Sequence, residues 1–195
     1  MLYYYIQESI SSPYMITSAS TIIPKKSWKE PGISFTKGAK IEEAVPNPMI
    51  YEVNFPESVN PPYLQRSYPV VNGIFLEALQ KAEVDNFQLF PAELHNPETG
   101  KKWTRYNILN VIGLVDAALL EACEYDVIME GNDKIPPVYG FHKRVFSAEK
   151  LKNKPEMFRL WHSQELCISG RVADVLETIM TFNEWNLTGT PIEVK

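Results

Sequence analysis

The stretch MFRLWHSQELCIS, Met157–Ser169, brings together several side chains that can do chemistry. Its reactive groups are an imidazole, a hydroxyl, a carboxylate and a thiol, on His162, Ser163, Glu165 and Cys167. Nucleophilic catalysis uses such a set, because a hydroxyl or thiol must be activated by a base that a third group orients. One interpretation is therefore a thiol-dependent enzyme that uses Cys167 or the other cysteine, Cys123.

The alternation of side chains along the same stretch favours a structural interpretation. Successive side chains of an extended strand point to opposite faces, so Phe158 and Leu160 share one face. MFRLW and ELCIS then form two short strands, and HSQ is the turn between them. The polar character of His162 and Ser163 follows from exposure at that turn, and Ser169 is a candidate N-cap for the next helix. We therefore predict no catalytic residue here.

Other patterns for metal or nucleotide binding are missing from the chain. The three histidines, His95, His142 and His162, lie far apart, and neither HExxH nor CxxC spacing occurs. No P-loop and no GxGxxG follows an expected strand, so a glycine-rich phosphate cradle is not supported. The prediction is a protein with no metal and no cofactor.

The composition is that of an ordinary globular protein. The chain has 195 residues, of which 45% are hydrophobic and 22% charged. It starts without a basic and apolar leader and has no apolar run of roughly 18 residues, so we expect a cytoplasmic protein with no membrane partner. Two cysteines do not make a disulfide framework, and a net charge of −5 argues against nucleic-acid binding.

The negative charge is concentrated in one segment. No Lys or Arg lies between Arg105 and Lys134, and the acids in that gap are Asp116, Glu121, Glu124, Asp126, Glu130 and Asp133. These six acids exceed the whole-chain imbalance of −5. One interpretation is a solvated acidic face. The other is a docking surface for a basic partner, for which the candidate partner-binding residues are Glu121, Glu124, Asp126, Glu130 and Asp133.

Two segments have the spacing of an amphipathic helix. Apolar residues recur at i, i+3, i+4 and i+7 from Val71 and again from Val172. Most other apolar segments are typical of strands, and we expect Asn86–Leu94 to form a long hairpin with Arg105–Ala117 across the NPETGK turn. The expected class is α+β, a mostly antiparallel sheet with two main amphipathic helices.

The two helical segments also resemble each other. GIFLEAL aligns with GRVADVL, and each is followed by a similar short segment, PAEL or PIEV. A duplicated helix–strand unit is one interpretation, and chance is the other, because amphipathic helices share a binary pattern. The proline-rich segment Pro56–Pro69 is a candidate boundary between an N-terminal β-rich part, 1–64, and a C-terminal α+β part, 65–195. One continuous domain is the alternative.

Several of these segments together resemble a known family. They are the run from GIFLEALQK to LNVIGLVDA, then MFRL, LCISGRVADVLE and LTGTPIEV, over roughly Val71 to Val194. This pattern is similar to the bacterial polymorphic-toxin immunity family first described from a myxobacterial protein. One departure follows VDA, where an acid and a Ser are expected and the chain has Leu120, Glu121 and Cys123. The resemblance implies a non-enzymatic antidote that binds a cognate protein toxin. The acidic segment described above suits a basic toxin.

Three hypotheses follow from the sequence. The first is a toxin-binding immunity protein, with Trp103, Trp161 and Trp185 as candidate aromatic anchors, although core burial is an equal alternative for each. The second is the thiol-dependent enzyme. The third is a homo-oligomeric structural or assembly protein. The sequence leaves the oligomeric state and the toxin's identity open.

Overall fold

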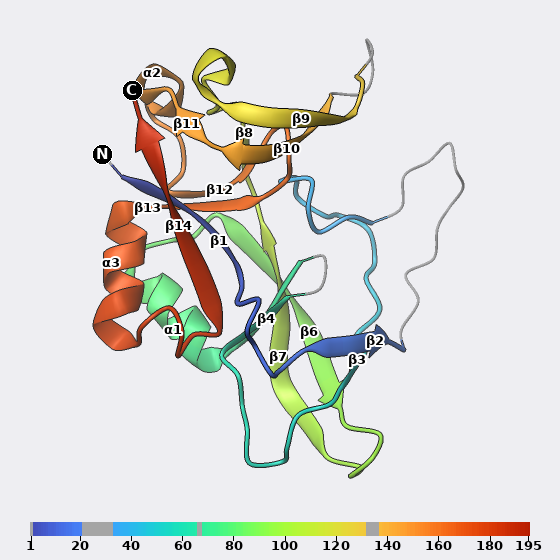
Figure 1. The fold of residues 1–195 in the computed structure, drawn as a ribbon. Helices are drawn as coiled ribbons and strands as arrows, with labels where there is room; N and C mark the ends of the chain where they lie inside the picture. Colours follow the sequence, from blue (N-terminus) through green and yellow to red (C-terminus); the bar gives the residue numbers. More distant parts are fainter. Residues whose placement is uncertain (1, 21–32, 66–67, 132–136) are drawn as a thin grey trace.

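The computed structural model describes residues 2–20, 33–65, 68–131 and 137–195 and is shown in Figure 1. Strands make up 42% of the described residues and helices 15%, and most of the strands form two curled sheets. We call these sheets A and B. Sheet A has the spatial order β11 (Val145–Phe146), β14 (Leu187–Val194), β1 (Tyr3–Glu8), β13 (Leu166–Ser169), β12 (Met157–Leu160) and β8 (Leu114–Val115).

Sheet B is built mainly from the middle of the chain. Its spatial order is β2 (Ile16–Ala19), β3 (Met49–Val53), β6 (Phe87–His95), β7 (Lys102–Val111), β5 (Pro69–Asn72) and β4 (Tyr63–Gln65). The hairpin of β6 and β7 confirms the pairing expected across the NPETGK turn. Most neighbours are antiparallel, but β3 with β6, β8 with β12 and β11 with β14 are parallel pairs.

The remaining strands and the helices lie outside the two sheets. A separate two-stranded ribbon consists of β9 (Glu124–Met129) and β10 (Val138–Lys143), and in Figure 1 it lies above β12 and β13. The helices are α1 (Gly73–Lys81), α2 (Ala148–Leu151), α3 (Gly170–Ile179) and the 3-10 helix η1 (Leu120–Ala122). Ser169 accepts the Val172 N–H at 3.3 Å, which confirms it as the N-cap of α3.

The central core lies where both sheets meet the packed pair of helices α1 and α3. Trp185 is fully buried in it, donates from Nε1 to the Leu176 carbonyl at 3.0 Å and meets Phe75 edge-on. Strands β12 and β13 are buried on both faces, because Met157 and Leu166 belong to this core while Phe158 belongs to a second one. Burial on both faces explains why these strands are almost continuously apolar.

The expected α+β class with two main amphipathic helices is wrong, because the protein is mostly β. Helices α1 and α3 do lie where the two apolar stripes recur, but they have only 9 and 10 residues. They also lead into different sheets, α1 to β6 in sheet B and α3 to β14 in sheet A. Strands as short as β8 and β11, of 2 residues each, have no periodicity that a sequence pattern can display.

The first strand of the chain lies in the middle of sheet A. Strand β1 pairs with β13 on one side and with β14 on the other, so Tyr3 lies opposite both Ser169 and Ile192. MFRL and LCIS form the antiparallel pair β12 and β13, as expected from their alternation. Sheet A therefore joins the beginning of the chain to its end.

Candidate functional site

The β9–β10 ribbon exposes several large apolar side chains. Its strands pair antiparallel, and β9 has no second neighbour in the described part of the chain. Every side chain of β9 except Tyr125 is exposed, including those of Val127, Ile128 and Met129, and Ile128 is 69% exposed. An edge strand with exposed apolar side chains is available to pair with or pack against another molecule.

Most of the predicted partner-binding acids lie on or beside this ribbon. Glu121 is on η1, Glu124 and Asp126 are on β9, and Glu130 follows it, all with exposed side chains. Asp133 lies outside the described residues. Because side chains of a strand alternate, Glu124, Asp126 and Ile128 share one face, which we call the outer face. Asp126 meets His142 of β10 on this face at 2.8 Å, and both side chains stay largely exposed.

The opposite face of the ribbon is aromatic and attaches it to the body of the protein. Tyr139 stacks on Tyr125 at 4.5 Å between ring centres and on His162 at 4.8 Å. The Tyr139 N–H donates to the His162 carbonyl at 2.8 Å, and Phe141 is buried beneath the ribbon. These contacts hold the ribbon against the turn after β12, so its outer face and free edge point away from the core.

The expectation that His162 is exposed at its turn is wrong, because its side chain is buried against the β9–β10 ribbon. Its Nδ1 has no hydrogen-bond partner among the described residues, and the nearest carboxylate oxygen, Asp116 Oδ1, is 3.8 Å away. Lys150 donates to Asp116 Oδ2 at 3.1 Å and so occupies that carboxylate. Burial lowers the pKa of the His162 imidazole, and Lys150 lowers it further, while Asp116 opposes them. Its surroundings therefore favour the neutral imidazole, which stacks on Tyr139.

The other reactive groups of Met157–Ser169 are also engaged within the fold. Ser163 Oγ donates to Glu165 Oε2 at 2.9 Å, and the Glu165 carboxylate is paired with Arg144. Cys167 is completely buried, and burial raises the pKa of its thiol. A buried thiol with a raised pKa is a poor nucleophile, because the thiolate is the reactive form.

Cys123 and the tryptophans have distinct places in the fold. The Cys123 thiol donates to the Val145 carbonyl at 3.4 Å and accepts that residue's N–H at 3.3 Å. Trp103 packs on Phe55 with ring centres 5.0 Å apart, Trp185 is a core residue, and Trp161 is 39% exposed at the turn next to His162. Of the three candidate anchors, Trp161 is thus the most accessible.

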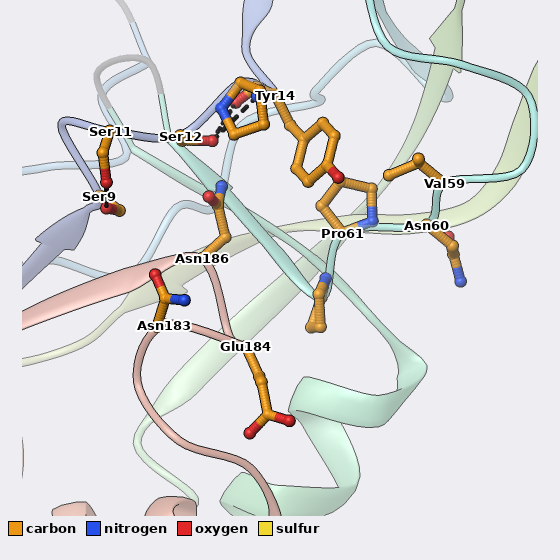
Figure 2. Close-up of a pocket in the computed structure, with 12 residues that line it drawn as sticks. Ser9, Ser11, Ser12, Tyr14, Val59, Asn60, Pro61, Asn183, Glu184 and Asn186 are labelled. Carbon is orange, nitrogen blue, oxygen red and sulfur yellow. Dashed lines mark hydrogen bonds between the residues drawn. The ribbon is translucent and has the colours of Figure 1, made fainter.

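A polar hollow of about 420 Å³ lies beside the residues that follow the C-terminal end of β1 and is shown in Figure 2. Most of its polar groups already have partners. Asn186 Nδ2 donates to Glu8 and to the Tyr63 carbonyl, and Glu184 accepts from the hydroxyl and backbone N–H of Thr181. Ser9 and Ser11 bond to each other, as Figure 2 shows. The hollow therefore offers few unpaired groups to a ligand.

Among the described residues, no group of His, Cys, Asp and Glu could hold a metal ion, and no helix is long and apolar enough to cross a membrane. The features that stand out are instead an exposed edge strand with acidic and apolar side chains, which is typical of a surface that contacts another protein. The chain belongs to the immunity protein family Imm11, whose model matches residues 10–190. A search of curated proteins found no match.

Sequence reasoning missed the apolar part of this surface. Val127, Ile128 and Met129 belong to the segment YDVIMEGNDK. Its pattern predicts a strand but does not show whether that strand is buried or exposed. An apolar strand is usually assigned to the core, and only the tertiary structure shows that β9 lies outside it. The neighbouring acids were the one available signal, because charges are costly to bury.

Proposed function

We propose that this chain is a non-enzymatic immunity protein that binds and neutralises a cognate bacterial toxin domain in the cytoplasm. Membership of the Imm11 immunity family supports this role. Both cysteines are engaged, Cys167 in the core and Cys123 with Val145, which disfavours the thiol-dependent enzyme. The toxin is the partner, and no cofactor takes part.

The outer face and free edge of the β9–β10 ribbon are the proposed docking surface. The single observation that carries this assignment is that β9 exposes Ile128 on the outer face, between the acids of that face and Glu130. Val127 and Met129 alternate with Ile128 and are also exposed, so apolar surface extends around the strand. Acids on an edge strand also prevent self-association, so charge alone would not identify a binding surface. Apolar side chains surrounded by charges supply both a desolvated contact and its polar rim.

A basic toxin domain is the partner that this surface fits. Glu121, Glu124, Asp126 and Glu130 are all exposed and close along the chain, and an acidic surface attracts a basic one before contact. The free edge of β9 can in addition pair with a strand of the toxin, because its outward backbone groups have no neighbouring strand in the described part of the chain.

The test measures binding to the toxin domain encoded by the neighbouring gene. The double variant Glu124→Lys/Asp126→Lys should weaken the affinity at least about tenfold, with a slower association rate and a smaller salt dependence. The matched control is Glu42→Lys/Glu43→Lys, which changes the net charge equally at two exposed acids outside the ribbon. Equal weakening by both doubles would remove the ribbon from the interface, and absence of any complex would remove the immunity role.

A second pair of variants tests the apolar contribution. Ile128→Ser removes an exposed side chain from the ribbon, whereas Leu89→Ser removes an exposed side chain from β6 in sheet B. Only the former should weaken toxin binding, mainly through faster dissociation. Size-exclusion chromatography of the free protein distinguishes toxin binding from the homo-oligomer hypothesis. If the free protein is a dimer and Ile128→Ser makes it a monomer, β9 is a self-association surface instead.

A further inference from the structure

Arg159 is a buried cation without a counter-ion in the described part of the chain. It lies on β12 and is only 2% exposed. One Nη donates to the Gln164 carbonyl at 3.0 Å and the other to the Phe35 carbonyl at 3.5 Å, while Nε has no partner. Burial lowers the pKa of this guanidinium, which shows how unfavourable its surroundings are for a charge. A buried charge normally has an ionic partner, because desolvation is otherwise uncompensated.

A hollow of about 320 Å³ adjoins this side chain. Its lining is mostly hydroxyl and amide groups, on Tyr5, Thr36, Gln65, Ser163 and Gln164, together with Arg159, Glu165 and Leu166. Two of these lining residues are joined by a hydrogen bond, from Thr36 Oγ1 to Gln164 Oε1 at 2.6 Å. The hollow therefore lies between the segment around Phe35 and the turn that joins β12 to β13.

The charges around the hollow leave one positive charge unbalanced. Among the described residues that line the hollow, Glu165 is the only carboxylate, and it is already paired with Arg144. Arg144 also lies over the Tyr5 ring, 4.4 Å from its centre, which fixes this ion pair at the wall. Arg159 is thus left to attract an anion. The lining hydroxyls of Tyr5, Thr36 and Ser163 are already hydrogen-bonded within the fold, so the guanidinium is the main attraction for that ligand.

We propose that this hollow is a binding site for a carboxylate group, with Arg159 as its ionic partner. The planar guanidinium matches a carboxylate geometrically, and the single unbalanced charge fits a singly charged group better than a phosphate dianion. A volume of 320 Å³ accommodates a small organic acid or one acidic side chain of another protein. The site is separate from the β9–β10 ribbon and does not depend on the proposed toxin binding.

The test uses the free full-length protein and the Arg159 Nε–H signal in a ¹H–¹⁵N correlation spectrum, assigned by its loss in Arg159→Lys. Titration with sodium acetate should move this signal saturably and raise the melting temperature, while sodium chloride of equal ionic strength should do neither. Phosphate is the second anion, and tighter binding of phosphate than of acetate would overturn the carboxylate assignment. Equal responses to acetate and chloride, or none to either, would overturn the site.

Two further arms complete the experiment. A capped aspartate, N-acetyl-aspartate amide, presents the carboxylate as a side chain. Saturation by this probe assigns the site to an acidic residue of a partner protein, and saturation by acetate alone assigns it to a free small acid. Thr36→Val keeps Arg159 and removes a hydroxyl from the lining of the hollow. Thr36→Val should weaken acetate binding several-fold. If neither Thr36→Val nor a folded Arg159→Lys variant changes the affinity for acetate, the proposal is overturned.

Discussion

The Tyr139 ring stacks on the His162 imidazole, with ring centres 4.8 Å apart and planes inclined by 11°. This contact joins the β9–β10 ribbon to the turn after β12, and the Tyr139 N–H reinforces it by donating to the His162 carbonyl. The ribbon has only this aromatic face with which to pack, because the side chains of its outer face are exposed. Its position relative to the body of the protein therefore depends on a few side chains.

Tyr139→Ala should loosen the ribbon without unfolding the protein. The substitution removes stacking on both Tyr125 and His162, for which we expect a loss of about 1–2 kcal/mol. Hydrogen–deuterium exchange should become about tenfold faster in β9 and β10 and stay unchanged in sheets A and B. Tyr139→Phe is the control, since it keeps both ring contacts. Unchanged exchange in Tyr139→Ala would show that other contacts hold the ribbon.

The neutral state of His162 should make the protein less stable in acid. Because burial lowers the folded-state pKa below 6.5, the unfolded chain binds a proton more readily than the folded one. The stability contribution is then fully present above the unfolded pKa of about 6.5 and is lost as the pH falls towards the folded pKa. Urea denaturation between about pH 7 and pH 5 should show this loss. His162→Phe keeps a stacking ring and should flatten the profile, and an identical profile would exclude the imidazole as its cause.

Glu8 should have the opposite pH dependence. Burial raises the pKa of its carboxyl from 4.5 to about 7, against hydrogen bonds from Gln65 and Asn186. The folded state therefore favours the protonated acid, and its stability contribution is present below about pH 4.5 and lost as the pH rises through 7. Glu8→Gln keeps an oxygen for Asn186 and cannot ionise. It should stabilise the protein by about 1 kcal/mol near pH 8, a value discounted for partial exposure, and by nothing near pH 4.

Gly38 and Gly100 form a matched pair for backbone strain. Both have positive φ, 64° and 76°, but a Cβ on Gly38 would lie 2.8 Å from the Gly113 backbone, whereas Gly100 has nothing within 4 Å. Gly100→Ala should cost about 1 kcal/mol from conformation alone. Gly38→Ala should cost about 2 kcal/mol more, because it also separates the Gly38 carbonyl from the Gly113 N–H that it accepts. Chemical denaturation measures both losses of unfolding free energy. Equal losses would mean that the Gly38 and Gly113 backbones can move apart at little cost.

The fragment 65–195 should not fold by itself. It lacks β1, whose removal leaves β13 and β14 without their shared neighbour in sheet A. The fragment also lacks Ile6, so part of the central core is exposed to solvent. We therefore expect the fragment to show no cooperative unfolding. Circular dichroism during thermal unfolding measures this. A sharp transition would instead support two separate parts divided near residue 64.

Several local features could be predicted from the sequence because their causes lie within a few residues. The β6–β7 hairpin follows from apolar strands on either side of the NPETGK turn, and the cap at Ser169 follows from its place before an apolar stripe. The strand–turn–strand structure of Met157–Ser169 likewise followed from local alternation. The burial of His162 at the turn did not, because it depends on the distant Tyr139. The fold class was wrong, because short strands such as β8 are created by a distant partner rather than by their own pattern.

The sequence by itself determined the family resemblance, the main hairpin and the concentration of acids in one segment. Tertiary structure decided which strands are buried on both faces, as β12 and β13 are, and which strand is left outside the core, as β9 is. It also placed Arg159, whose strand is otherwise apolar, against a hollow whose described lining residues include no carboxylate other than the paired Glu165. Burial and charge pairing depend on residues far apart in the chain, such as Phe35 and Arg159, so neither could be obtained from local spacing.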